Sequence, residues 1–193
     1  LLHDIGRFEQ VRLYHTFVDK DSINHGEYGV KVLFEDGLIR KFIEDESFDD
    51  IIKIAILNHN RANIQDGITA RQLLHSKIIR DADKIDIFRI IADNKYSMKA
   101  IFWYDTWNME EISKEVLNEF YEGHELDYSK IQNNADVLVT FYAYMYDLNF
   151  EESREIIWKN KYLDIFTKRA IEKFSSEKIK REAEKMLEKC KEI

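Results

Sequence analysis

Residues 48–59, FDDIIKIAILNH, decide the fold class because their apolar members, among them Ile51, Ile54 and Ala55, recur at helical spacing. Ser47 and Asp50 stand in the spacing of a capping box, which predicts a helix over residues 48–59. This is the strongest apolar run of the chain, and it is too short to span a membrane.

Helical periodicity continues on both sides of this stretch, whereas the alternation typical of strands does not occur. We therefore predict an all-α protein. A break around residues 94–106 suggests a first region over 1–93 and a C-terminal helical region over 94–193 that packs on it. The further predicted helices run from Ser22 or Asp21 to Gly37, from Ala70 to about Asp93, from Asn108 to Gly123, from Asp136 to Leu148, from Asn149 onward, and along a C-terminal stripe of Ile179, Ala183, Met186, Cys190 and Ile193.

Composition narrows the function classes. The 193 residues include no Pro and one Cys, and 29 Lys and Arg stand against 37 Asp and Glu, a net charge of −8. These values disfavour a collagenous chain, a disulfide scaffold and a general surface for nucleic acid or anionic membrane. With no signal peptide visible and one cysteine, we expect a cytoplasmic location.

Histidines and aspartates gather in the first half of the chain. His3 and Asp4 stand where an apolar segment ends, and the end of a helix favours a cation. One imidazole with one carboxylate suits Zn, Mn, Fe or Ni better than Ca. Further along, Asp83 shares a helix face with Ile79 and Ile87, where a carboxylate is costly unless it is paired or binds a metal. Asp81 lies on another partly apolar face, so spacing alone leaves both aspartates open.

Four segments follow one another in a specific order, namely His3-Asp4-Ile5-Gly6-Arg7, His25-Gly26-x-x-Gly29, Ala55-Ile56-x-x-His59 and Asp81-Ala82-Asp83-Lys84-Ile85. Together they resemble the HD-domain metal-dependent phosphohydrolase superfamily, over about residues 1–92. The resemblance implies an orthogonal helical bundle with a buried metal centre of the binuclear type.

The resemblance also implies the ligands, carried over position by position as His3, Asp4, His25, His59 and Asp83. Asp83 is preferred because the motifs of the family place the ligand in Ala-Asp-Lys. The first histidine of the family pattern stands a helix upstream of His-Asp, so we expect it in a segment before Leu1.

By the same resemblance, the centre takes two divalent ions (Mn, Fe, Co or Ni, with Mg as a further candidate), bridged by Asp4 as the catalytic carboxylate. The implied reaction is hydrolysis of a phosphate ester or anhydride, with nucleotides as the expected substrates. Arg7, Arg61, Lys84 and His15 are the candidate substrate-binding residues.

Two other functions remain open at this point. The same ligands serve a di-iron oxygenase in some relatives, and an HD module can also sense a ligand without catalysis. We expect a small phosphate compound as partner, without extended nucleic acid or membrane. The C-terminal helix is expected to pack within the chain, and a homodimer through it is the alternative.

Overall fold

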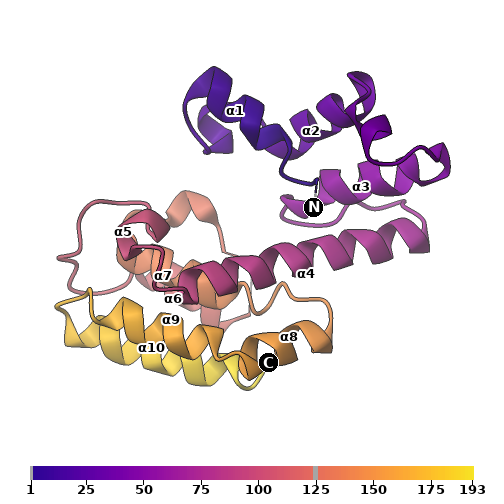
Figure 1. The fold of residues 1–193 in the computed structure, drawn as a ribbon. Coiled ribbons are helices and arrows are strands. Elements are labelled where there is room, and N and C mark those ends of the chain that lie inside the picture. Colours follow the sequence, from indigo (N-terminus) through magenta and orange to yellow (C-terminus); the bar gives the residue numbers. More distant parts are fainter. Residues whose placement is uncertain (1, 124–125) are drawn as a thin grey trace. The chain divides into compact units, whose positions relative to one another are not determined.

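A computed structural model describes residues 2–123 and 126–193, so Leu1, His124 and Glu125 lie outside the description. Across these two ranges the regular structure consists of helices without strands (Figure 1), which confirms the all-α class. In the same ranges, none of the helices is both long enough and apolar enough to span a membrane.

Contacts divide the chain into two compact units, Leu1–Asp83 and Lys84–Ile193. The division falls inside helix α4 (Ala70–Ala92), whereas the sequence pattern suggests a boundary after residue 93, where α4 has just ended. The physical reason is that each part of α4 serves a different core. Ile79 packs into the core of unit 1, whereas Phe88 and Ile91 are buried in the core of unit 2.

Unit 1 is built from short helices around a small apolar core centred on Leu33, Ile39 and Ile56. Helix α2 contacts both α1 and α3. The elements of unit 1 that precede α4 are α1 (Gly6–Tyr14), η1 (Asp19–Asp21), α2 (His25–Val30), the π-helical turn η2 (Lys31–Glu35), η3 (Leu38–Lys41), η4 (Glu46–Phe48) and α3 (Asp49–His59).

Two predicted helix caps in unit 1 are wrong, and hydrogen bonds explain both. The side chain of Asn24 accepts from the amides of Gly26 and Glu27, at 2.9 and 3.1 Å, so α2 begins after Asn24 and not at Ser22 or Asp21. Ser47 does not cap α3: its amide donates to Asp45 Oδ1 at 2.8 Å, which starts η4 instead. The predicted end at Gly37 is confirmed, because Gly37 has φ 76°.

Two glycines allow α1 and α2 to touch through their backbones. A Cβ atom on Gly6 would lie 2.1 Å from the carbonyl oxygen of His25 and 2.6 Å from the amide nitrogen of Gly29. On Gly29, a Cβ would lie 3.4 Å from the carbonyl oxygen of His3. The close approach therefore requires glycine at position 6 and sets where His25 stands relative to His3.

Unit 2 holds the larger core, rich in aromatic side chains such as Phe102, Phe120, Phe141 and Phe166. Helix α10 packs against α7 and α9, and α6 packs against α7 (Figure 1). The elements after α4 are α5 (Met98–Ile101), α6 (Lys114–Tyr121), η5 (Tyr128–Lys130), α7 (Asn134–Ala143), α8 (Glu151–Lys159), α9 (Tyr162–Ile171) and α10 (Glu177–Cys190).

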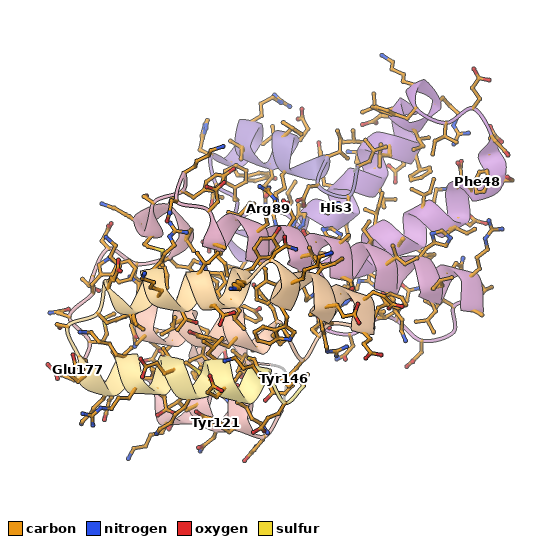
Figure 2. The ribbon with its side chains drawn as sticks, turned by 60° about the horizontal axis from the view of Figure 1, so that its bottom comes forward. His3, Phe48, Arg89, Tyr121, Tyr146 and Glu177 are labelled. Carbon is orange, nitrogen blue, oxygen red and sulfur yellow. The ribbon has the colours of Figure 1, made fainter. Side chains whose placement is uncertain are left out.

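Helix α10 follows its predicted apolar stripe, since Ile179, Ala183, Met186 and Cys190 are all fully buried. Figure 2 shows Glu177 at its start. The Sγ atom of Cys190 lies 3.6 Å from the carbonyl oxygen of Tyr142, and burial raises the pKa of the Cys190 thiol to about 12.

The helix predicted from Asn108 to Gly123 corresponds to α6. Its predicted start at Asn108 is wrong, and a buried carboxylate explains why. The amide and hydroxyl of Ser113 donate to the side chain of Asp136 at 2.9 and 3.0 Å. These bonds fix Ser113 just before α6, which begins at Lys114. Gly123, with φ 73°, lies beyond its end, as expected.

Replacing Gly6 by Ala tests the backbone contact between α1 and α2. Because the new methyl group would meet backbone atoms that cannot rotate away, we expect the free energy of unfolding of unit 1 to fall by about 3 kcal/mol or more. Gly37→Ala is the matched control: its Cβ meets no atom within 4 Å, and only its left-handed backbone costs about 1–2 kcal/mol. Urea unfolding followed by circular dichroism measures both, and an equal loss for the two variants would contradict the close contact.

Candidate metal centre

Five side chains converge in unit 1, and each is held near the end or on the face of a helix. His3 and Asp4 lie in the turn that leads into α1, His25 is the first residue of α2, and His59 is the last residue of α3. Asp83 comes from α4 and ends the sequence of unit 1. Figure 2 labels His3.

Asp4 is the centre of this group. One of its carboxylate oxygens, Oδ1, lies 3.3 Å from His25 Nε2 and 3.6 Å from His59 Nε2. The other, Oδ2, lies 3.4 Å from His3 Nε2. His3 Nε2 is also 3.3 Å from Asp83 Oδ1, so all five residues predicted as ligands are brought together. His3, Asp4 and His59 alone offer three ligand atoms within 4.8 Å of one another.

The rings of His25 and His59 face each other through their Nε2 atoms at 2.9 Å. Each ring is fixed from its other side. His25 Nδ1 lies 2.7 Å from a carboxylate oxygen of Asp19, and His59 Nδ1 lies 2.6 Å from the carbonyl oxygen of Ile56. Carbonyl and carboxylate oxygens only accept, so both Nδ1 atoms carry a proton. In the neutral form of each ring, the Nε2 lone pair then points into the space that the two rings share. Only a cation, either a proton or a metal ion, relieves that repulsion.

The charges of the centre are strongly coupled. Burial by itself would raise the pKa of the Asp4 carboxyl, but hydrogen bonds from the Nε2 atoms of His25, His3 and His59, when these carry protons, outweigh burial and hold that pKa far below its usual range. Hydrogen bonds to Asp4 and Asp83 raise the pKa of His3 to about 9, against burial, which lowers it. Asp4 is thus a carboxylate at neutral pH, and the metal-free His3 is protonated.

The donor set fits a divalent transition-metal ion. Imidazole nitrogens and carboxylate oxygens are its usual ligands, and His25 and His59 show the outer hydrogen bonds to carboxylate and backbone carbonyl that orient metal-bound histidines. His3 departs from this pattern, because its Nδ1 is buried without a hydrogen-bond partner among the described residues. His3, Asp4, His25, His59 and Asp83 are the residues that could hold an ion.

The sequence did not reveal a second layer around these residues. Asp19, from η1, binds the ring of His25 and accepts from Gln10 Nε2 at 2.8 Å and from Asn60 Nδ2 at 3.1 Å. Hydrogen bonds from His25 and Gln10 lower the pKa of the Asp19 carboxyl, although burial opposes them. Asn60 directly follows His59, which is the one sequence signal for its place here.

Arg80 fixes the end of α3. Its buried guanidinium donates to the carbonyl oxygens of Asn58 and Ala62, both at 3.0 Å, and to that of Arg61. The last carbonyl groups of a helix lack hydrogen-bond partners within the helix. A cation that binds them satisfies these groups and is attracted by the negative end of the helix dipole. Arg80 thereby holds the segment that follows His59.

Of the predicted substrate-binding residues, Arg7 lies at the centre itself. Its Nε donates to Asp4 Oδ1 at 3.2 Å, and its Nη1 donates to the carbonyl oxygen of Phe17 at 2.9 Å. Nη1 also lies 3.7 Å from Asp19 Oδ1. Arg7 therefore links two acidic side chains of the site.

The other three predicted residues lie differently. Arg61 donates to Gln65 Oε1 at 2.9 Å. Lys84 is buried in unit 2, where Asp147 neutralises its ammonium group. His15 ends α1 in a left-handed conformation, with φ 56°, and is exposed, outside the group of converging side chains.

Comparisons of the chain with protein-family models, with curated proteins and with solved structures return no match. What can be said about function therefore rests on the geometry of the site and on the motifs of the sequence.

The coupling between His3 and its two aspartates predicts a pH dependence of stability. Because the folded chain binds the His3 proton more tightly than the unfolded chain, this proton stabilises the fold fully below pH 6.5, and the stabilisation is lost as the pH rises through about 9. In the presence of a chelator, we expect the stability difference between wild type and His3→Asn to be larger at about pH 6 than at about pH 10.

Urea unfolding at the two pH values measures this difference. His15→Asn serves as the control, because His15 is exposed and outside the cluster. A difference for His3→Asn that is the same at both pH values would contradict the coupling.

Proposed function

We propose that the chain is a metal-dependent phosphohydrolase whose centre is formed by His3, Asp4, His25, His59 and Asp83. The observation that carries the proposal is the pair of Nε2 atoms of His25 and His59, which face each other at 2.9 Å while their Nδ1 atoms are held by acceptors. Two lone pairs directed at one space, next to the ionised Asp4, are the arrangement that a divalent cation stabilises.

The chemistry fits hydrolysis of a phosphate ester or anhydride. When bound, such ions lower the pKa of a coordinated water and neutralise charge on a phosphoryl group. The chain itself supplies Asp4, whose low pKa keeps it available as a ligand at any physiological pH. It also supplies guanidinium groups at Arg7 and Arg61, the side chains best suited to phosphate oxygens.

A small phosphate compound, such as a nucleotide, is the substrate class we infer. The resemblance of the four sequence segments to the HD-domain superfamily supports it, as does the lack of a broad basic surface implied by the net charge of −8. The same ligands would also suit an oxygen-using di-iron centre, so the metal has to be identified together with the activity.

A screen of the full chain against nucleotides, phosphomonoesters and phosphodiesters, with Mn²⁺, Fe²⁺, Co²⁺ and Mg²⁺ in turn, tests the proposal. Release of phosphate or nucleoside that depends on the metal supports it. Tightly held iron with an oxygen-sensitive absorption band, and no hydrolysis with any metal, would favour the oxygenase instead. Metal binding without turnover of any compound would favour a sensing module.

Replacing Asp4 by Ala removes the carboxylate that all three histidines approach. We expect hydrolysis with Mn²⁺ to be lost, while the helical circular dichroism stays near that of wild type. Asp66→Ala, which removes an exposed carboxylate of the same unit, is the control and should keep its activity. Retained activity in Asp4→Ala would refute the central role of Asp4.

Replacing Arg61 by Ala tests whether its guanidinium binds the phosphate. We expect a loss of about 1.5–3 kcal/mol in kcat/KM for phosphate-bearing substrates, the range for a hydrogen bond to a charged group. Arg71→Ala is the control, because Arg71 lies over the ring of Phe48, 5.7 Å from its centre. Kinetics like those of wild type would assign Arg61 to its contacts with Gln65 and Glu27 alone.

A further inference from the structure

Asp19 approaches the candidate metal centre from outside. Both of its carboxylate oxygens lie near His25 Nδ1, Oδ1 at 2.8 Å and Oδ2 at 2.7 Å. Nδ1 and Nε2 stand on different sides of an imidazole ring, and Nε2 of His25 is the atom that faces Asp4 and His59. Asp19 therefore meets His25 on the side away from the ligand atoms.

Two side chains and one backbone amide fix the carboxylate of Asp19. Gln10, which is fully buried in α1, donates to Oδ1 at 2.8 Å. Asn60, just after α3, donates to Oδ2 at 3.1 Å. The backbone amide of His25 itself lies 3.4 Å from Oδ2. Asp19 is thus oriented before any ion binds.

This network also fixes the segment between α1 and α2. Gln10 Nε2 reaches Ser22 Oγ at 2.9 Å and the carbonyl oxygen of Ile23 at 3.1 Å, in addition to Asp19. The amide of a single buried glutamine therefore holds the first residue of η1 and the two residues after η1 against α1. These bonds hold the segment so that the carboxylate of Asp19 points toward His25.

We propose that Asp19 is a positioning residue for the metal centre: it keeps the proton of His25 on Nδ1 and the ring turned so that Nε2 is free to coordinate. The inference rests on the proposed metal site and deepens it, because it assigns to η1 the control of one ligand. A carboxylate that accepts from the far nitrogen of a ligand histidine also makes the ring a better donor to the metal.

Asp19 itself would not serve as a ligand. Its two oxygens are taken up by His25, Gln10 and Asn60, and Arg7 lies between Asp19 and Asp4, with Nη1 3.7 Å from Asp19 Oδ1 and Nε 3.2 Å from Asp4 Oδ1. The guanidinium separates two negative charges that would otherwise repel each other across the site.

Three variants of the full chain test this role. Asp19→Ala removes the acceptor, and Asp19→Asn keeps an oxygen that can accept from Nδ1 but removes the charge. Asp21→Ala is the matched control, because it removes an exposed carboxylate from the same short helix. Circular dichroism first establishes that each variant is folded.

Competition with a coloured chelator then measures the affinity for Zn²⁺ and Co²⁺. We expect Asp19→Ala to bind both ions about 10–100-fold more weakly than wild type, with Asp19→Asn in between and Asp21→Ala unchanged. The visible absorption of bound Co²⁺ should shift in Asp19→Ala, because the ring of His25 is no longer held.

Proton NMR of the Zn²⁺-loaded chain supplies a readout that a merely structural residue would not change. We expect a slowly exchanging proton on His25 Nδ1 in wild type and Asp21→Ala, and its loss in Asp19→Ala.

The outcomes separate this inference from the proposed function. Should wild type bind neither Zn²⁺ nor Co²⁺, the metal centre and the role of Asp19 are both overturned. Should wild type bind an ion while folded Asp19→Ala binds it equally well, only the role of Asp19 is overturned. A loss of affinity in Asp21→Ala as large as in Asp19→Ala would overturn it too, since charge alone would then explain the effect.

Discussion

The contact between the backbones of α1 and α2 is the constraint on which the rest of unit 1 depends. At Gly6 the two helices approach so closely that no side chain fits between them, and the atom nearest to a Cβ there would be the carbonyl oxygen of His25. His3 and Asp4 stand three and two residues before Gly6 in the sequence. A single crossing of two short helices therefore brings three of the converging side chains together, with a precision that flexible side chains packed between helices could not give.

This crossing brings several polar groups close together, and each of them needs a hydrogen-bond or ion-pair partner. Buried imidazoles and carboxylates are costly unless each finds a partner. In unit 1 the partners are arranged in two layers: Asp4 and Asp83 meet the inward nitrogens, while Asp19 and the carbonyl of Ile56 meet the outward ones. Unit 1 thus combines a small apolar core with a polar cluster, whereas the core of unit 2 is rich in aromatic side chains.

Much of the helical pattern could be predicted, because apolar periodicity reports burial directly, as the stripe of α10 illustrates. The residues at which helices begin are harder to predict from the sequence. Asn24 caps α2 through its side chain, and Ser113 is placed before α6 by donating to Asp136. Other residues nearby offer similar side chains, and only the packed chain selects between them. Asp19 shows the same limit: it stands two residues from Asp21 with the same chemistry, and the position of α1 decides which of the two meets His25. The sequence predicted which motif residues would come together, but it could not predict the distances between their side chains. Their role in metal binding stays a prediction.

The burial of Cys190 gives the molecule an internal probe. It is the single cysteine of the chain and the last residue of α10, and its thiol is buried against the carbonyl group of Tyr142. Thiol reagents attack the thiolate, so a buried thiol of raised pKa reacts only while its helix is detached. The rate at which Cys190 is labelled then measures how often unit 2 opens, and this measurement requires no mutation. Because the sequence of unit 1 contains no cysteine, labelling reports on the opening of unit 2 alone.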